Sequence, residues 1–280
     1  MFTQLLACTD GSPYGETACD YGLFLAKALP ARLTALHVLD IRVIEGPLLA
    51  DVSGMIGAAE YFASMPNFRN LMQEKGRAVC EGFATRAAAA GVDAACTVET
   101  GHPLHTILER HTGTNLLILG RRGENEEFGG ELIGSIAERV VRRAQVPCLV
   151  TPAHFKPVTA ILTATDGSPL GSKAVDAGAD LAARLGATLT VLSVAEKVDT
   201  ATARRTAELA VEATRIRLPG ATPLVREGNA AESIVAAAAE VKADLIVMGA
   251  HSHSRVREWF VGCTTLRILA DSALPALFVR

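Results

Sequence analysis

The feature that most constrains the fold of this chain is an internal duplication. The pentapeptide TDGSP occurs at residues 9–13 and again at 165–169, each time directly after a short apolar run. Aligning residues 3–40 with residues 159–196, at the resulting offset of 156, gives identity at about half of the positions. Because 280 residues suffice for two domains of ordinary size, the repeat predicts two copies of one domain in tandem.

The repeat continues through the later part of each half, but with a shorter offset. The matching segments are GHPLHTI with GNAAESI, NLLILG with DLIVMG, and QVPCLV with ALPALF, at offsets of 127 to 129. The first half therefore carries nearly thirty additional residues, which we place at roughly 41–76. Their glycines, prolines and aromatic residues predict a partly helical loop that acts as a lid or as a subunit contact.

Each half alternates short branched-aliphatic runs with alanine-rich segments of helical period. This alternation predicts the α/β class, with two tandem doubly wound, Rossmann-like domains whose five-stranded parallel sheets carry helices on both faces. The domains are expected at 1–152 and 158–280, joined at the PAHFKP segment. Strands are expected near 4–9, 32–38, 92–98, 115–120, 146–151, 159–165, 187–194, 221–226, 244–249 and 275–279.

Composition limits the classes of partner. Lys+Arg 27 against Asp+Glu 30 gives a net charge of −3, so no broad attraction to nucleic acid or to an anionic membrane is expected. The apolar runs are far shorter than the roughly 20 residues of a membrane span, and the start of the chain lacks a basic leader. We therefore expect a cytoplasmic protein whose partners are small molecules or other proteins.

The six cysteines show no close pairing such as C-x-x-C. This pattern, in a chain expected in the cytoplasm, predicts reduced thiols with mostly structural roles. Cys8 and Cys148 lie in strand-like apolar runs, where a thiol packs as a small hydrophobic group. Cys263 differs, because it lies beside a glycine in a candidate binding motif.

Candidate binding residues stand at the ends of predicted strands. Ligands of doubly wound sheets bind beyond the carboxyl ends of the strands, where the strand order reverses. Asp10 and Asp166 follow the first strand of each half, and Gly120 and Gly249 close the fourth. Each aspartate also suits an Asx turn that accepts bonds from the following amides, and one side chain can serve both purposes.

The stretch after Gly120 favours an anion site in the first half. Gly120 and Gly123 would let backbone amides approach a ligand without an intervening Cβ. Gly134 and Ser135 then open an amphipathic helical segment, whose first N–H groups attract an anion. Ser135 suits both a helix cap and a direct hydroxyl bond to phosphate.

These residues resemble the universal stress protein family, whose pattern is G-x-x-G, nine residues, then G-[S/T]. The first half matches it with Gly120, Gly123, Gly134 and Ser135, although ten residues separate the second and third glycines. The whole chain is similar to two such domains fused, with the HUP-type fold of that family. The resemblance implies ATP as ligand, with the glycines and serine at its phosphates and the aspartate at its adenosine part.

The second half departs further from the family pattern. It keeps the nine-residue spacing, but Ser252 stands for the second glycine and Cys263 follows Gly262 where the pattern has Ser or Thr. Thr264 is the next residue along. The second half is therefore expected to bind nucleotide more weakly. Its His253, Arg255 and Arg257 nevertheless give a positive loop that could hold phosphate despite the degraded glycine pattern.

The resemblance also implies apolar residues around the nucleotide. Val38 and Val194, at the ends of the second strands, would line the adenine pocket, and Leu119 and Ile136 would flank the phosphate glycines. Core packing is an equally good interpretation of these four side chains.

Charged residues near the motif complicate the prediction. The carboxylates of Glu124, Glu126 and Glu127 would repel a phosphate unless they point to water or Mg²⁺ accompanies the ATP. Arg121 and Arg122 would offset part of that charge. Histidines invite a zinc hypothesis, but their spacing gives it little support, and we predict no metal site; they are His102, His105, His111, His251 and His253.

No constellation of residues indicates covalent or acid–base catalysis, since the chain has no G-x-S-x-G, no H-E-x-x-H and no lysine-bearing P-loop. We therefore expect hydrolysis of any bound ATP to be slow at most. The family resemblance implies a cytoplasmic stress-response protein that binds ATP or a related adenine nucleotide, mainly in its first half, as a regulatory ligand. The resemblance also implies pairing of the last strands, because the last strand commonly pairs across a dimer in that family. Here the strands at QVPCLV and ALPALF would pair within one chain as a pseudo-dimer, and two chains would associate further as a homodimer. The alternatives are a protein-interaction scaffold with degenerate sites, an ATP-pyrophosphatase and a phosphorylation-receiver domain.

Overall fold

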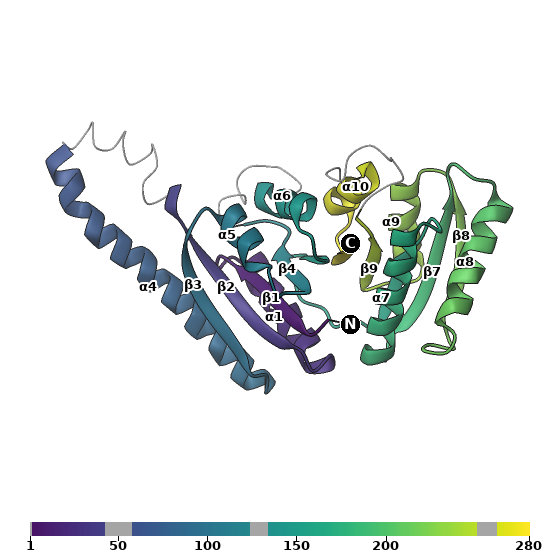
Figure 1. Cartoon of the computed structure of the whole chain (residues 1–280), viewed down its shortest axis with the longest axis horizontal. Coiled ribbons are helices and arrows are strands. Elements are labelled where there is room, and N and C mark those ends of the chain that lie inside the picture. Colours follow the sequence, from purple (N-terminus) through teal and green to yellow (C-terminus); the bar gives the residue numbers. More distant parts are fainter. Residues whose placement is uncertain (1, 43–57, 124–133, 251–261) are drawn as a thin grey trace.

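The chain forms one continuous ten-stranded sheet in the computed structural model, which describes residues 2–42, 58–123, 134–250 and 262–280 (Figure 1). The strand order is β3-β2-β1-β4-β5-β10-β9-β6-β7-β8. Strands within each half pair in parallel, whereas β5 and β10 pair antiparallel. The predicted α/β class is confirmed, and the two halves join through their last strands.

Every strand overlaps the range expected from the sequence. Most are buried aliphatic runs closed by turn residues, whereas the edge strands β3 and β8 contain no buried residue. The strands are β1 (Gln4–Thr9), β2 (Arg32–Asp40), β3 (Ala94–Gly101), β4 (Leu116–Gly120), β5 (Cys148–Thr151), β6 (Ala160–Ala164), β7 (Thr188–Ala195), β8 (Thr222–Glu227), β9 (Leu245–Gly249) and β10 (Ala276–Val279).

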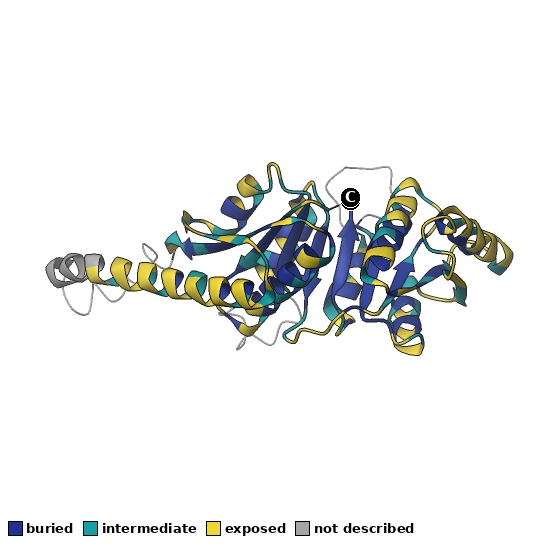
Figure 2. Ribbon diagram, turned by 90° about the horizontal axis from the view of Figure 1, so that it is seen from below, coloured by how far each residue is buried: buried dark blue, intermediate teal, exposed yellow. Residues whose placement is uncertain are grey.

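Helices cover both faces of the sheet (Figures 1 and 2). One face carries α1 (Pro13–Ala28), α4 (Ala58–Ala90), α7 (Pro169–Leu185) and α8 (Thr200–Thr214). The other carries α5 (Pro103–Arg110), α6 (Ser135–Arg143), α9 (Ala230–Glu240) and α10 (Cys263–Asp271). Within the described part of the chain, no helix is both long enough and apolar enough to cross a bilayer.

The repeated TDGSP segment is a strand-to-helix turn in which every residue has a structural use. Asp10 Oδ1 accepts a hydrogen bond from the Ser12 amide at 3.0 Å, which is the expected Asx turn. Gly11 adopts a φ of +83°, a conformation that disfavours side chains. Ser12 caps α1 by accepting from Gly15 N, and Pro13 fills the first helical turn.

The second copy repeats this turn closely. Asp166 Oδ1 accepts from the Ser168 amide at 3.0 Å, Gly167 has a φ of +77°, and Ser168 caps α7 at Gly171 N. The pentapeptide recurs because the same left-handed turn and helix cap recur in both halves.

The insertion in the first half is more regular than predicted. From residue 58 it is helical, and it forms the start of α4, a single helix of 33 residues that continues to Ala90. At 1.5 Å per residue such a helix is about 50 Å long. Figure 2 shows that much of α4 is exposed and that it projects beyond the sheet. Residues 43–57 lie outside the described part.

The joint between the halves is anchored rather than free. Phe155 packs edge-on against Tyr21, with ring centroids 4.8 Å apart. Lys156 Nζ lies 2.5 Å from the buried carboxylate of Asp244, whose other oxygen accepts bonds from Thr159 N and Oγ1. Burial alone would raise the pKa of Asp244, but the Lys156 ammonium and the Thr159 bonds hold that pKa below its ordinary value.

We expect Asp244→Asn to lower the free energy of unfolding at pH 7 by about 2 kcal/mol, because the variant loses charged hydrogen bonds at a buried site. Since the folded pKa is depressed, this stabilisation is present above the ordinary value of 3.8 and is lost as the pH falls through the folded pKa. Urea denaturation of both proteins between pH 7 and pH 3 measures the effect.

Lys156→Met is the matched control, because this ammonium is 70% exposed and its loss should cost less than about 1 kcal/mol. A difference between wild type and Asp244→Asn that persists unchanged to pH 3 would show that the carboxylate charge is not the cause.

Candidate functional site

A cavity of about 560 Å³ lies in the first half, at the carboxyl ends of β1 and β4. These two strands pair in parallel, with Cys8 opposite Leu119. The helix that follows β1 packs on one face of the sheet, and α6, which comes after β4, packs on the other. The cavity therefore lies at the point where the strand order reverses, which is where doubly wound sheets hold their ligands.

The two loops at this point are in contact. A Cβ added to Gly123 would lie 2.9 Å from Asp10 Oδ2, so the loop after β4 passes directly over the carboxylate that follows β1. A larger residue at position 123 would displace Asp10 or the loop.

The structure shows a packing requirement for glycine at position 120 that the sequence alone did not reveal. A Cβ at this position would lie 2.8 Å from the backbone carbonyl carbon of Tyr14 and equally close to its Cβ. Gly120 thus permits α1 to pack closely on the end of β4. At the equivalent Gly249, the nearest atom is Leu170 Cγ, at 2.9 Å.

The structure brings together every site residue predicted in the first half. All of them line this same cavity: Asp10, Val38, Leu119, Gly120, Gly123, Gly134, Ser135 and Ile136. Gly134 is the N-cap of α6, and no described side chain caps that helix. The first turn of α6 therefore faces the cavity with its positive dipole end.

The residues predicted in the second half do not line this cavity. Asp166 is exposed, and Val194 and Gly249 lie near the ends of β7 and β9. Gly262 is the N-cap of α10, where Cys263 and Thr264 are the first helical residues. Ser252, Arg255 and Arg257 lie outside the described residues.

Part of the cavity wall was missed by sequence reasoning. Asp40 is the last residue of β2, just as Asp10 directly follows β1. This shared position at a strand end could have identified Asp40 as a candidate site residue from the sequence. The α4 contribution had no sequence signal, because the rotation of that helix was unknown. The additional lining residues include His37, Asp40, Arg42, Phe68, Met72, Lys75 and Ile107.

Charged groups at the cavity have distinct partners. Arg42 forms an ion pair with Asp40 at 2.6 Å. Burial opposes ionisation of Asp40, but the hydrogen bonds from Arg42 outweigh this and lower the pKa of the carboxyl group. Arg122 lines the cavity. Arg121 instead is buried and donates a hydrogen bond to the carbonyl of Leu274, in the second half. Its side chain is therefore turned away from the cavity, contrary to the expectation that it offsets the charge of the glutamates that follow it in the sequence.

His37 is a buried polar group on the cavity wall. Its Nδ1 lies 3.0 Å from the carbonyl oxygen of Thr9. Because a carbonyl only accepts, Nδ1 carries the proton. This bond fixes the orientation of the ring at the junction of β1 and β2.

The expectation of six reduced cysteines is wrong for one pair, because Cys80 and Cys96 form a disulfide. Their separation of 16 residues gives no motif, and α4 and β3 bring them together. The remaining described thiols are Cys8, Cys19 and Cys148, which are at least partly enclosed, and the exposed Cys263. Burial raises the pKa of Cys19 and of Cys148 to about 12, so these two are unreactive thiols.

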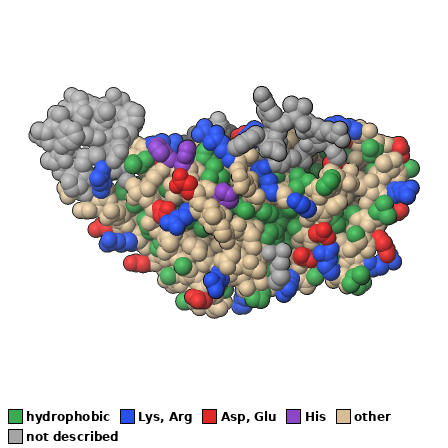
Figure 3. Space-filling view, in the orientation of Figure 1, with side chains coloured by type: hydrophobic (Ala, Val, Ile, Leu, Met, Phe, Trp, Pro, Cys, Tyr) green, Lys and Arg blue, Asp and Glu red, His purple; other side chains and the backbone are tan. Residues whose placement is uncertain are grey.

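No three His, Cys, Asp or Glu side chains converge on a metal position within the described residues. The rings of His102 and His105 lie 6.1 Å apart. His251, His253 and the three glutamates at 124, 126 and 127 lie outside the described part. On the face seen in Figure 3, described side chains of both charges are interspersed.

Comparison with known proteins agrees with this geometry. The family model described as "Universal stress protein family" matches residues 1–152 and again residues 157–280. The chain belongs to the universal stress protein family and contains two of its domains in tandem.

Two curated relatives and one solved structure illustrate the match. The universal stress protein Slr1230 of Synechocystis is 31% identical over 288 residues, which cover 99% of both chains. YxiE of Bacillus subtilis is 29% identical over 152 residues, covering 54% of this chain and 99% of its own. A universal stress protein of Archaeoglobus fulgidus has a TM-score of 0.75 at 21% identity, covering 99% of this chain and 95% of that one, and so shares its fold.

We expect Gly120→Ala to destabilise the protein by about 1–3 kcal/mol, because the new methyl group meets the Tyr14 backbone, which cannot rotate away. Gly249→Ala should cost less, since a change of the Leu170 rotamer can relieve its contact. The shift of each urea midpoint, compared with wild type, measures both effects. Equal shifts would refute the packing role assigned to Gly120.

Proposed function

We propose that this universal stress protein binds ATP, or a related adenine nucleotide, in the cavity of its first half and responds to that ligand. The observation that carries the proposal is the meeting of Asp10 with Gly123, directly beside the N-terminus of α6. A hydroxyl-binding carboxylate and an anion-attracting helix end thus border one space. The cavity volume lies within the range of about 300–1,000 Å³ that is usual for small-molecule sites.

Several residues that line the cavity are apolar and suit a planar base. Val38 and Ile107 come from β2 and α5, and Leu119 and Ile136 come from β4 and α6. Asp10, which lies against Gly123, would accept hydrogen bonds from ribose hydroxyl groups.

Other lining residues suit the phosphates. Gly123 and Gly134 expose backbone to the cavity, Ser135 adds a hydroxyl group, and Arg122 adds a positive charge. A helix N-terminus stabilises an anion through its amides and its dipole. Mg²⁺ bound with the ATP would balance further carboxylates near the phosphates.

The proposed role is regulatory rather than catalytic. Among the described residues that line the cavity, no nucleophile is paired with a placed base, so we expect hydrolysis of ATP to be slow at most. The second half is the weaker binder in this proposal. We place the protein in the cytoplasm. The pairing of β5 with β10 makes each chain a pseudo-dimer. In this proposal an unidentified protein partner binds differently to the nucleotide-bound and nucleotide-free forms.

Asp10→Asn tests the proposal, because the amide oxygen can keep the bond from the Ser12 amide while the charge is lost. We expect the affinity for ATP to fall by about tenfold, the equivalent of one charged hydrogen bond. Isothermal titration calorimetry with Mg²⁺ and ATP measures this.

Asp93→Asn is the matched control, since Asp93 is an exposed carboxylate of the first half outside the cavity lining. It should leave the affinity unchanged. Wild-type protein that binds no adenine nucleotide would contradict the proposal and favour a protein-interaction scaffold.

A further inference from the structure

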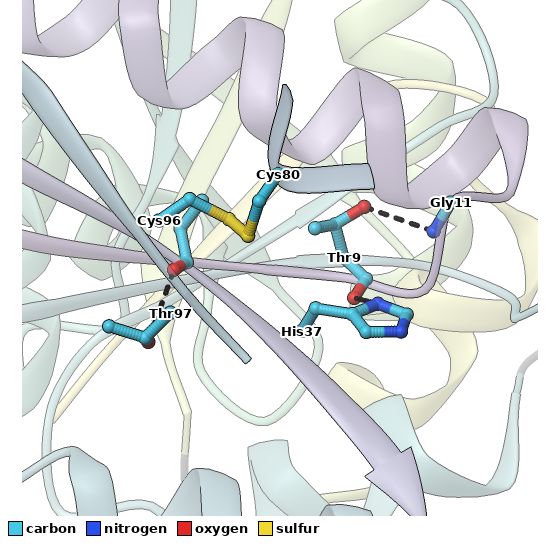
Figure 4. The surroundings of a disulfide bond; sticks show 7 residues. Thr9, Gly11, His37, Cys80, Cys96 and Thr97 are labelled. Carbon is cyan, nitrogen blue, oxygen red and sulfur yellow. Dashed lines mark hydrogen bonds between the residues drawn. A yellow bond between two sulfur atoms is a disulfide. The ribbon is translucent and has the colours of Figure 1, made fainter. Parts of the chain in front are cut away.

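The disulfide between Cys80 and Cys96 lies next to the proposed nucleotide cavity. It joins α4 to the edge strand β3, and Figure 4 shows it close to Thr9 and His37, which both line the cavity. Both cysteines are only partly buried. Neither cysteine is enclosed in the core, unlike Cys19 and Cys148.

α4 supplies one wall of the cavity from the side of the disulfide. Phe68, Met72 and Lys75 line the cavity at spacings of four and three residues, so they lie on one face of the helix. None of the residues 67–75 is buried. Burial therefore holds this part of α4 less firmly than the later turns, where Gly76 and Phe83 are buried.

The next turns of α4 rest directly on the binding elements. A Cβ added to Gly76 would lie 3.2 Å from His37 Cδ2, and a Cβ added to Gly11 would lie 2.9 Å from Val79 Cγ2. Phe83, further along, is fully buried. The disulfide at Cys80 is therefore located between the buried end of α4 and the part that lines the cavity.

The second half has no equivalent of this link. Thr206 of α8 lies over Gly167 as Val79 lies over Gly11, so Ala207 corresponds to Cys80. The strand registers pair Leu36 with Thr97 and Leu192 with Leu224, so Pro223 corresponds to Cys96. The disulfide is therefore confined to the half that contains the cavity described above.

We propose that the Cys80–Cys96 pair is a redox-sensitive clamp that holds α4 against the cavity, so that oxidation strengthens nucleotide binding and reduction weakens it. The expected effect of the disulfide on nucleotide binding rests on the proposed function, whereas its expected effect on the mobility of α4 does not. A reducing cytoplasm keeps most such pairs as thiols, so formation of the disulfide would report oxidising conditions.

The redox step is ordinary thiol–disulfide exchange. A thiolate of a dithiol attacks one protein sulfur, forms a mixed disulfide and releases the other cysteine as a thiolate, which takes up a proton. The second thiol of the reductant then displaces the remaining cysteine. Two electrons pass to the protein, and the reductant leaves as a cyclic disulfide.

Loss of the link frees the 67–75 segment to move away from the cavity. We expect the affinity for ATP to fall about tenfold, within the roughly 5- to 150-fold range of coupling between sites. By linkage, saturating ATP should favour the disulfide over the dithiol by the same factor, which corresponds to about 30 mV for this two-electron couple.

The experiment compares oxidised protein, protein reduced with dithiothreitol and the double variant C80S/C96S. Equilibrium dialysis with ATP measures affinity, and amide hydrogen exchange of residues 67–79 measures the freedom of α4. Dithiothreitol added to the double variant is the matched control, because any effect there comes from other thiols. If the double variant does not fold, the reduced and oxidised wild type decide the question.

Tenfold weaker binding and faster exchange in the reduced protein and in C80S/C96S would support the clamp. Equal affinity and equal exchange in all forms, or the same response to dithiothreitol in the double variant, would overturn it. If no form binds ATP, the proposed function fails, and the exchange rates alone then support or overturn the clamp on α4.

Discussion

The parallel pairing of β1 with β4 is the constraint on which the site depends. It places the end of β1, where Asp10 stands, beside the end of β4, where the glycine loop begins. Because the following helices leave to opposite faces, nothing in the sheet itself fills the space between the two loops. The contact of Gly123 with Asp10 then sets the width of that space. A side chain added at Gly123 would therefore displace Asp10 or the loop.

The duplicated halves share the same sheet and strand-to-helix turn but differ in the helix that packs beside the third strand of each half. Both halves keep the turn made by Asp, Gly and Ser and the close approach of a glycine to the first helix. The first half adds α4, whose length carries it past the sheet edge and over the cavity, and ties it with a disulfide. The second half has the shorter α8 in that place. The features that distinguish a site from a scaffold are thus concentrated in one half.

The sequence predicted the features that depend on local pattern. Strand positions followed from aliphatic runs, and the tandem fold followed from the repeat. Asp10, the glycines and Ser135 of the first-half cavity followed from strand ends and a helix start, whereas Val38, Leu119 and Ile136 came from the family resemblance. The α4 wall was not predictable, because a helix with little apolar contrast does not indicate which face meets the sheet. The Cys80–Cys96 link was missed for a related reason: the two residues lie on different elements, and only the packing of α4 on β3 brings them together. The burial of the Arg121 side chain likewise depends on its hydrogen bond to the carbonyl of Leu274, which lies 153 residues away in the sequence.

A crystal structure of the oxidised protein grown with Mg²⁺ and a non-hydrolysable ATP analogue tests the central claim most directly. The account predicts the ribose within hydrogen-bonding distance of Asp10, and the phosphates against the backbone of Gly123, Gly134 and Ser135. A nucleotide bound elsewhere on the molecule, or phosphates turned away from the N-terminus of α6, would contradict it.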